Sequence, residues 1–133
     1  LASYYAAAAA TVRKDIQPGS GQAVLVAINP GTYPDLSIAQ TADITVMHES
    51  ADLNLPAAPA SLASYPSAKF AYLALGISNL TQTQAAALSS LYQQGVGYVY
   101  LTDQGSGNDP WAKLSTSYPA QIQIIQALNQ SKN

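Results

Sequence analysis

Four largely apolar segments of this chain each end in polar residues or a glycine. The first, residues 24–28, stops at Asn29, which a Pro-Gly pair follows. Apolar runs of this length are typical of strands that are covered on both faces of a parallel sheet. From these runs we predict strands at residues 23–29, 43–49, 68–75 and 96–102.

The segments around the strands carry apolar residues at helical spacing. They predict helices at residues 3–14, 34–41, 82–94 and 118–130. The positions expected to be buried are Tyr4, Tyr5, Ala8 and Val12 in the first helix, Ala85, Leu88, Leu91 and Tyr92 in the third, and Ile122, Ile125 and Leu128 in the last.

Strands and helices therefore alternate, and the predicted strands begin at 23, 43, 68 and 96. These spacings leave room for a crossover helix between parallel strands. We predict an α/β fold of four successive βα units. Such units can form a small open sheet, but small Ala and Gly residues on one strand face favour half of a (β/α)8 TIM-type barrel.

A half-barrel is a partial domain, so residues 1–133 are expected to form one incomplete unit. Its first and last strands would expose unpaired backbone groups. We therefore expect a partner, either another half-barrel chain or a second copy of this one. Because Leu1 is not an initiator Met, we interpret the chain as a processed or truncated piece of something longer.

The composition narrows the function classes. Only 9% of the residues are charged, well below the roughly 25% of typical soluble domains, and this favours a secreted or cell-wall-associated protein. The net charge of -2 and five Lys or Arg residues argue against nucleic-acid binding. With no Cys and one His, we expect no metal site. No apolar run approaches the roughly 20 residues of a membrane span.

Four motifs follow one another at the strand ends: NPGTYPD at 29–35, DITVMHES at 43–50, GVGYVYLTD at 95–103 and NDPW at 108–111. In this order and spacing they resemble the spherulin-4-like glycoside hydrolases. The resemblance covers nearly the whole chain and corresponds to the C-terminal half of that family's barrel. It implies hydrolysis of an amino-sugar, galactosamine-type polysaccharide without a cofactor.

The resemblance also implies a catalytic role for Glu49, which matches a carboxylate at the end of the family's sixth strand. The family's other acids, an adjacent Asp-Glu pair after the fourth strand, lie before Leu1. Glycoside hydrolysis needs one carboxyl group to protonate the leaving oxygen and another to attack or to activate water. The alternative is that Glu49 is a solvated residue at a strand end.

Two further residues near the strand ends are candidates for substrate contacts. Asn29 falls on the same strand face as Ala23 and Ala27, and its amide either bonds sugar hydroxyls or forms the turn before Pro-Gly. Strand alternation turns His48 away from Glu49. This favours a structural His48, unless a bulge ends the strand and brings its ring to the substrate.

The last strand leads to two more candidates. Asp103 either orients a cationic amino sugar or starts the turn that follows it. Trp111, the only tryptophan, either stacks on a sugar ring or plugs the end of the barrel. Asn79 and Asn129 begin Asn-X-Thr/Ser sequons and are possible glycosylation sites in a secreted protein.

We therefore predict part of a secreted glycoside hydrolase. The main alternatives are a non-catalytic structural or carbohydrate-binding protein that keeps the barrel shell, and a subunit of a larger assembly joined through its open edges.

Overall fold

The computed structural model describes residues 1–16, 22–53, 64–78, 82–105, 107 and 109–131, with the side chains of α3 described from residue 85 onward. The elements in chain order are α1 (Ala2–Asp15), β1 (Ala27–Ile28), α2 (Leu36–Ala39), β2 (Ile44–Ser50), the short 3-10 helix η2 (Ser67–Lys69), β3 (Phe70–Ala74), α3 (Gln82–Gln93), β4 (Tyr98–Leu101) and α4 (Tyr118–Gln130). The predicted alternation of helices and strands is confirmed.

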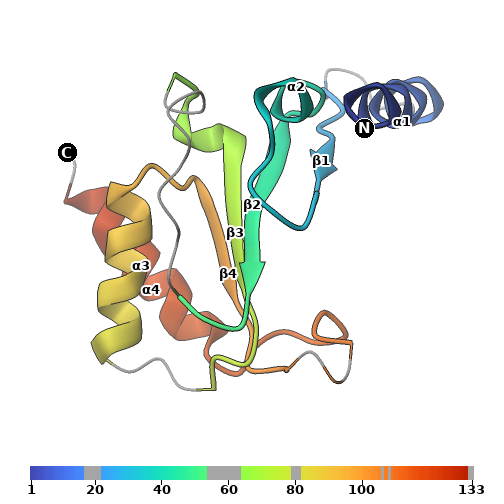
Figure 1. The fold of residues 1–133 in the computed structure, drawn as a ribbon. Coiled ribbons are helices and arrows are strands. Elements are labelled where there is room, and N and C mark those ends of the chain that lie inside the picture. Colours follow the sequence, from blue (N-terminus) through green and yellow to red (C-terminus); the bar gives the residue numbers. More distant parts are fainter. Residues whose placement is uncertain (17–21, 54–63, 79–81, 106, 108, 132–133) are drawn as a thin grey trace.

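The four strands form one parallel sheet in the order β1-β2-β3-β4 (Figure 1). β1, β3 and β4 are shorter than predicted, β1 most of all, whereas β2 has the predicted length of seven residues and begins one residue later. The reason lies at Val26, whose carbonyl accepts both the Asp43 and the Ile44 N–H, at 2.9 and 3.1 Å. Backbone pairing of β1 with β2 therefore begins at Val26, and the described residues before Val26 make no backbone hydrogen bonds of this sheet.

One face of the sheet packs against the helices. Leu88 and Leu91 of α3 are both 2% exposed, as predicted, and they join side chains of β2, β3 and β4 in one buried cluster. The members of this cluster are Ala39, Met47, Phe70, Tyr72, Ala74, Ile77, Leu88, Leu91, Val96 and Leu101. A second cluster joins Val26 to Ala9 of α1 and to Ala42.

The prediction for α4 is wrong at one position. Ile122 is 36% exposed, whereas its polar neighbour Gln121 is 2% exposed. The Gln121 side chain accepts the Leu101 N–H at 3.0 Å and donates to the Leu101 carbonyl at 2.7 Å. Gln121 is thus buried because it bonds the backbone of β4. The spacing of apolar residues along α4 does not indicate such a contact.

The apolar stripe expected on α1 is not buried in the described chain. Tyr4 is 69% exposed and Val12 37%, and Ala9 alone in this helix is buried. Figure 1 shows the cause, because α1 lies beyond β1 at the outer edge of the sheet. Its other side faces no described element.

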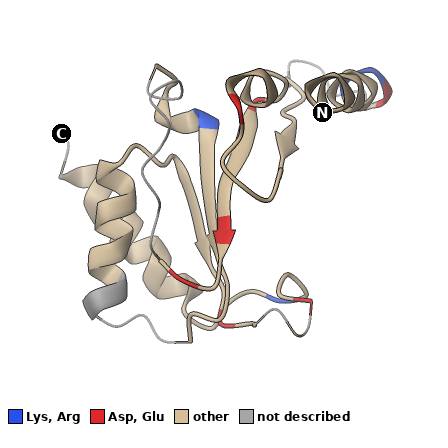
Figure 2. Cartoon of the chain, viewed as in Figure 1, with Lys and Arg blue, Asp and Glu red and all other residues tan. Residues whose placement is uncertain are grey.

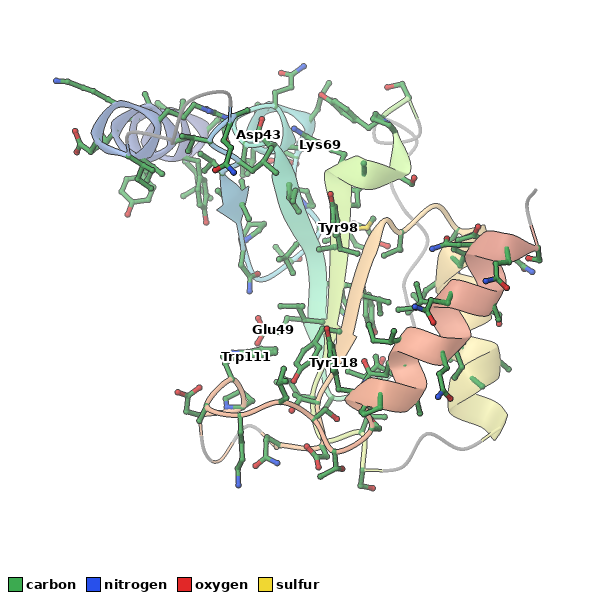
Figure 3. The ribbon with its side chains drawn as sticks, turned by 180° about the vertical axis from the view of Figure 1, so that it is seen from behind. Asp43, Glu49, Lys69, Tyr98, Trp111 and Tyr118 are labelled. Atoms are coloured by element: carbon green, nitrogen blue, oxygen red, sulfur yellow. The ribbon has the colours of Figure 1, made fainter. Side chains whose placement is uncertain are left out.

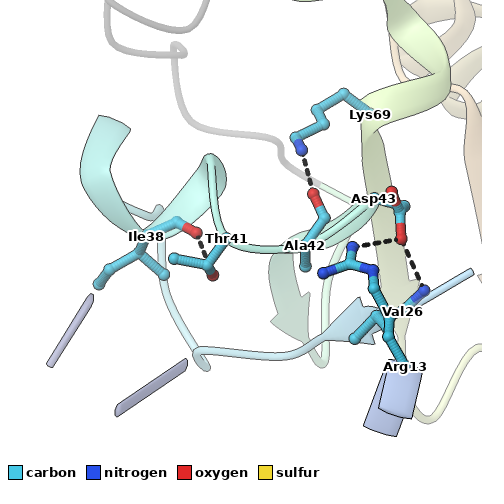
Figure 4. Close-up of polar contacts among 7 residues, drawn as sticks. All are labelled: Arg13, Val26, Ile38, Thr41, Ala42, Asp43 and Lys69. Atoms are coloured by element: carbon cyan, nitrogen blue, oxygen red, sulfur yellow. Dashed lines mark hydrogen bonds and ion pairs between the residues drawn. The ribbon is translucent and has the colours of Figure 1, made fainter. Parts of the chain in front are cut away.

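An ion pair holds α1 at this edge (Figure 4). One oxygen of Asp43, Oδ2, accepts from Arg13 Nη2 at 2.7 Å and from the Val26 N–H at 2.8 Å. These hydrogen bonds hold the pKa of Asp43 below its usual value. Close by, the Lys69 ammonium donates to the Ala42 carbonyl.

The second sheet face carries no helix within the described ranges. Paired residues of neighbouring strands point to the same side, which places Ala27, Ile44, Val46, Glu49, Ala71, Leu73, Tyr98 and Tyr100 on this open face. Tyr98 is 46% exposed there. None of the helices in the described part of the chain is both long and apolar enough to cross a membrane.

Candidate functional site

Polar side chains gather at the carboxyl edge of the sheet, where β1, β2 and β4 end. Figure 2 shows acidic residues at the end of β2 and in the loops below it, whereas α3 and α4 carry no charged residue in their described parts. In sheets of parallel strands this edge is where ligands bind. Asn29, Glu49 and Asp103 all follow or end strands here.

A β-bulge in β2 decides which side chain enters this site. Val46 pairs with Ala71, but the next pair is His48 with Tyr72, so that Met47 is an extra residue. Without that extra residue, His48 would oppose Leu73 on the open face and Glu49 would turn to the helices. The bulge instead places Glu49 on the open face opposite Leu73.

Asn29 and Glu49 meet on the open face. The Asn29 side-chain nitrogen, Nδ2, donates to Glu49 Oε2 at 2.6 Å. The other end of the same amide, Oδ1, accepts the Gly31 N–H at 3.0 Å. Asn29 therefore forms the expected turn and contacts the candidate carboxylate at the same time.

His48 lies on the helix side, among aromatic rings. Its ring is 6.4 Å from that of Tyr33 and 5.5 Å from that of Tyr72. The Tyr72 hydroxyl donates to the Asp52 carbonyl at 2.8 Å, and burial raises the pKa of Tyr72 to about 12. Burial also raises the pKa of Tyr33. The bulge thus leaves His48 in a packed aromatic group and not beside Glu49.

Asp103 is occupied by its own loop. Its Oδ2 accepts the Thr116 hydroxyl at 2.7 Å, and its Oδ1 accepts the Gln104 amide at 3.0 Å. The hydrogen bond from Thr116 and then that from Gln104 lower the pKa of Asp103. The carboxylate joins the end of β4 to the segment that leads into α4.

An aromatic group lies beside the site on the same face. The Tyr100 ring is 6.0 Å from that of Trp111 and 6.1 Å from that of Tyr118. Its hydroxyl accepts the Ser115 N–H at 2.9 Å, which fixes the ring. Trp111 remains 44% exposed, and Figure 3 shows it at the same end of the sheet as Glu49.

The strand register relates this aromatic group to Glu49. Glu49 pairs with Leu73, and Leu73 pairs with Tyr100, so the three side chains form one row across the open face. At a strand spacing of about 4.8 Å, Tyr100 lies roughly 10 Å from Glu49. No pattern in the sequence indicates the contact of Tyr100 with Trp111, because it depends on how the loop after β4 folds back.

The remaining candidate residues lie away from the carboxyl edge of the sheet or outside the residues that the structure describes. No group of three or more His, Cys, Asp or Glu residues that could hold a metal ion occurs among the described residues. Asn129 is exposed near the end of α4, and Asn79 lies outside the described residues. Whether either asparagine is glycosylated stays a prediction.

A separate cavity of about 270 Å³ lies on the helix side, between α3, α4 and the start of β4. The described lining residues are mostly aliphatic and include no carboxylate or histidine. The lining residues are Ser67, Leu88, Leu91, Tyr92, Gly95, Val96, Gly97, Val99, Ile125, Leu128 and Asn129. This cavity is distinct from the polar row on the open face.

With this geometry established, comparison with known proteins identifies the family. The profile of spherulation-specific family 4 matches residues 1–125. This chain belongs to the spherulation-specific family 4. The resemblance that the strand-end motifs indicated is thereby confirmed. A sequence comparison with curated proteins found no match to this chain.

The fold is also similar to a solved structure. Sph3 from Aspergillus clavatus, crystallised in complex with GalNAc, superposes with a TM-score of 0.63 at 16% sequence identity. The match covers 93% of this chain and 50% of Sph3. This chain therefore spans about half the length of Sph3.

Proposed function

We propose that this chain is one half of a (β/α)8 barrel and contributes catalytic and binding groups to a secreted glycoside hydrolase. Its substrate would be an amino-sugar polysaccharide of the galactosamine type. The observation that carries the proposal is the Asn29–Glu49 pair beside exposed Trp111, on the open face at the carboxyl edge of the sheet. The GalNAc bound to the similar Sph3 supports the sugar class.

The one-sided sheet supports the half-barrel. Crossovers between parallel strands are nearly always right-handed, so a sheet wound in the order β1-β2-β3-β4 receives its helices on one face. In a barrel the other face is buried because the sheet closes on itself. A further half, in the same or another chain, would cover Tyr98 and the exposed side of α1, including Tyr4.

In the proposed reaction Glu49 is one of two carboxyl groups that act on the glycosidic bond. The second belongs to the N-terminal half, where the family resemblance locates an adjacent Asp-Glu pair. Trp111 offers an aromatic face for a sugar ring. Asp103 supports the loop that carries Trp111, since it binds both ends of that segment.

The test is Glu49→Gln in the intact protein, assayed for chain cleavage of a partly deacetylated N-acetylgalactosamine polymer. Removal of one of two required carboxylates is expected to lower kcat at least a thousandfold, while the isosteric amide leaves polymer binding within about threefold. The measurement is reducing-end release alongside calorimetric binding. Asp15→Asn serves as the matched control, because it changes an exposed carboxylate at the end of α1, away from the carboxyl edge of the sheet.

A non-catalytic carbohydrate-binding protein is the second candidate, and the open-face geometry favours it in one respect. Among the described residues, Glu49 is the one carboxylate in the row with Leu73 and Tyr100. A single carboxylate suffices for binding but not for hydrolysis. Polymer binding without cleavage by the unmodified intact protein would establish this candidate and overturn the hydrolase proposal.

A further inference from the structure

The Asn29 amide has a defined orientation, because a backbone group anchors one end of it. The Gly31 N–H can only donate, so the atom it meets at 3.0 Å must be the amide oxygen. The amide nitrogen then necessarily faces Glu49 Oε2, 2.6 Å away. An amide flip would place two donors face to face at Gly31 and two oxygens face to face at Glu49.

The Asn-Pro-Gly sequence builds this orientation. Pro30 fixes its own φ near −65°, and Gly31 adopts a φ of 76°, which side chains on an L-residue disfavour. Together they return the Gly31 N–H to the Asn29 side chain directly after β1. The turn therefore presents a rigid N–H donor at the open face, and the bulge in β2 brings Glu49 to meet it.

We infer that Asn29 is a positioning residue that holds Glu49 as the ionised member of the catalytic pair. This inference rests on the proposed hydrolase function and deepens it. An N–H donor bonds a charged carboxylate oxygen about twice as strongly as a neutral acceptor, so the contact of Asn29 with Oε2 suits the carboxylate form of Glu49. The other oxygen, Oε1, is left to face the substrate.

This arrangement assigns the two acid–base roles. The second carboxylic acid gives its proton to the leaving oxygen as the glycosidic C–O bond breaks. Glu49 meanwhile either bonds to the anomeric carbon or takes a proton from the water that does so. Glu49 is then the carboxylate of the pair in both stereochemical courses, and the proton donor lies in the other half of the barrel.

The decisive variant is Asn29→Asp in the intact protein. Aspartate keeps an oxygen for the Gly31 N–H, so the turn is retained, but it replaces the donor to Glu49 with a second carboxylate. Two carboxylates in hydrogen-bond contact share a proton. We expect kcat to fall at least tenfold with KM within about twofold, and the acid limb of the pH–rate profile to move up by one pH unit or more.

The double variant Asn29→Asp with Glu49→Gln separates positioning from packing. It restores one amide and one carboxylate in the contact with their places exchanged, so thermal stability should return to that of the unmodified protein while hydrolysis stays absent. A second readout needs no activity: the Asn29 side-chain amide resonances should shift with pH in the unmodified protein and not in Glu49→Gln.

The outcomes distinguish the two proposals. If Glu49→Gln is inactive but Asn29→Asp keeps the kcat and pH profile of the unmodified protein, the positioning role is overturned and the hydrolase proposal stands. If both variants hydrolyse the polymer normally, the catalytic role of Glu49 and the positioning role of Asn29 are both overturned. If the unmodified intact protein binds the polymer without cleaving it, the hydrolase proposal itself is overturned. Asn29 amide resonances that do not respond to pH would overturn the inference whatever the activity.

Discussion

Asp43 is an exposed carboxylate that links α1 to the segment entering β1. It binds Arg13 of α1 and the Val26 N–H through one oxygen, and its side chain remains 38% exposed. Pairs at this exposure are screened by water and contribute about 0.2–1 kcal/mol. Asp43 therefore fixes where α1 attaches and adds little to the total free energy of unfolding.

The pH dependence of this contribution follows from the lowered pKa of Asp43. A carboxylate whose pKa is lower in the folded state stabilises the fold above its unfolded pKa, and the effect is lost as pH falls through the folded pKa. We expect Asp43→Asn to lower the free energy of unfolding by about 0.5 kcal/mol at pH 7. The difference should vanish once the pH falls below the lowered folded-state pKa of Asp43.

Denaturant unfolding at several pH values measures this effect. Asp35→Asn is the matched control, because Asp35 is exposed at the start of α2 and its side chain makes no capping hydrogen bond. A pH-independent difference for Asp43→Asn would show that the ion pair with Arg13 is not its source.

At the scale of elements, Gln121 takes the place of a neighbouring strand at the outer edge of β4. Its amide satisfies both backbone groups of Leu101, and its nitrogen also meets Ser117 Oγ at 3.0 Å. Covering an open strand edge in this way prevents unwanted strand pairing. In the proposed barrel, a strand from the other half would pair with β4 only before Leu101.

Replacement of Gln121 by Leu keeps the volume but leaves the buried N–H and carbonyl of Leu101 unpaired. Each such group costs about 1–3 kcal/mol, so we expect the free energy of unfolding to fall by about 2–4 kcal/mol in denaturant titrations. Gln123→Leu, the same change at an exposed position of α4, should stay within about 0.5 kcal/mol. Equal effects at both positions would contradict the edge-covering role.

The one-sided sheet is the main feature of the whole molecule. In the described part of the chain, helices cover one face, and the other presents Tyr98, 46% exposed, next to the row of Glu49 and Tyr100. An exposed aromatic side chain on an uncovered sheet face is a candidate contact for another protein segment. The half-barrel proposal supplies that segment, since a second half would bury the same face.

This feature predicts self-association of residues 1–133 when they are produced alone. Light scattering should give a mass that rises above 13.9 kDa with concentration, and Tyr98→Lys should reduce the association by placing a charge on the open face. Leu114→Lys is the control, because Leu114 is also exposed but lies in the loop before α4. A monomer at every concentration would contradict the proposed open face.

Much of the fold follows from the sequence alone. Apolar runs that stop at Asn29, Glu49 and Asp103 located the strand ends, and helical spacing located Leu88 and Leu91 in the core, because burial and secondary-structure period leave a direct mark on residue order. The same order identified the family through its strand-end motifs. Glycine and proline likewise marked the turn after Asn29.

Only the tertiary structure decided which polar residues meet. Alternation along β2 separates His48 from Glu49, but the extra residue Met47 determines that Glu49 and not His48 faces Asn29. The burial of Gln121 and the pairing of Tyr100 with Trp111 depend in the same way on segments distant in sequence. Local pattern records how a residue relates to its own helix or strand, whereas contacts across the sheet arise from register and loop closure.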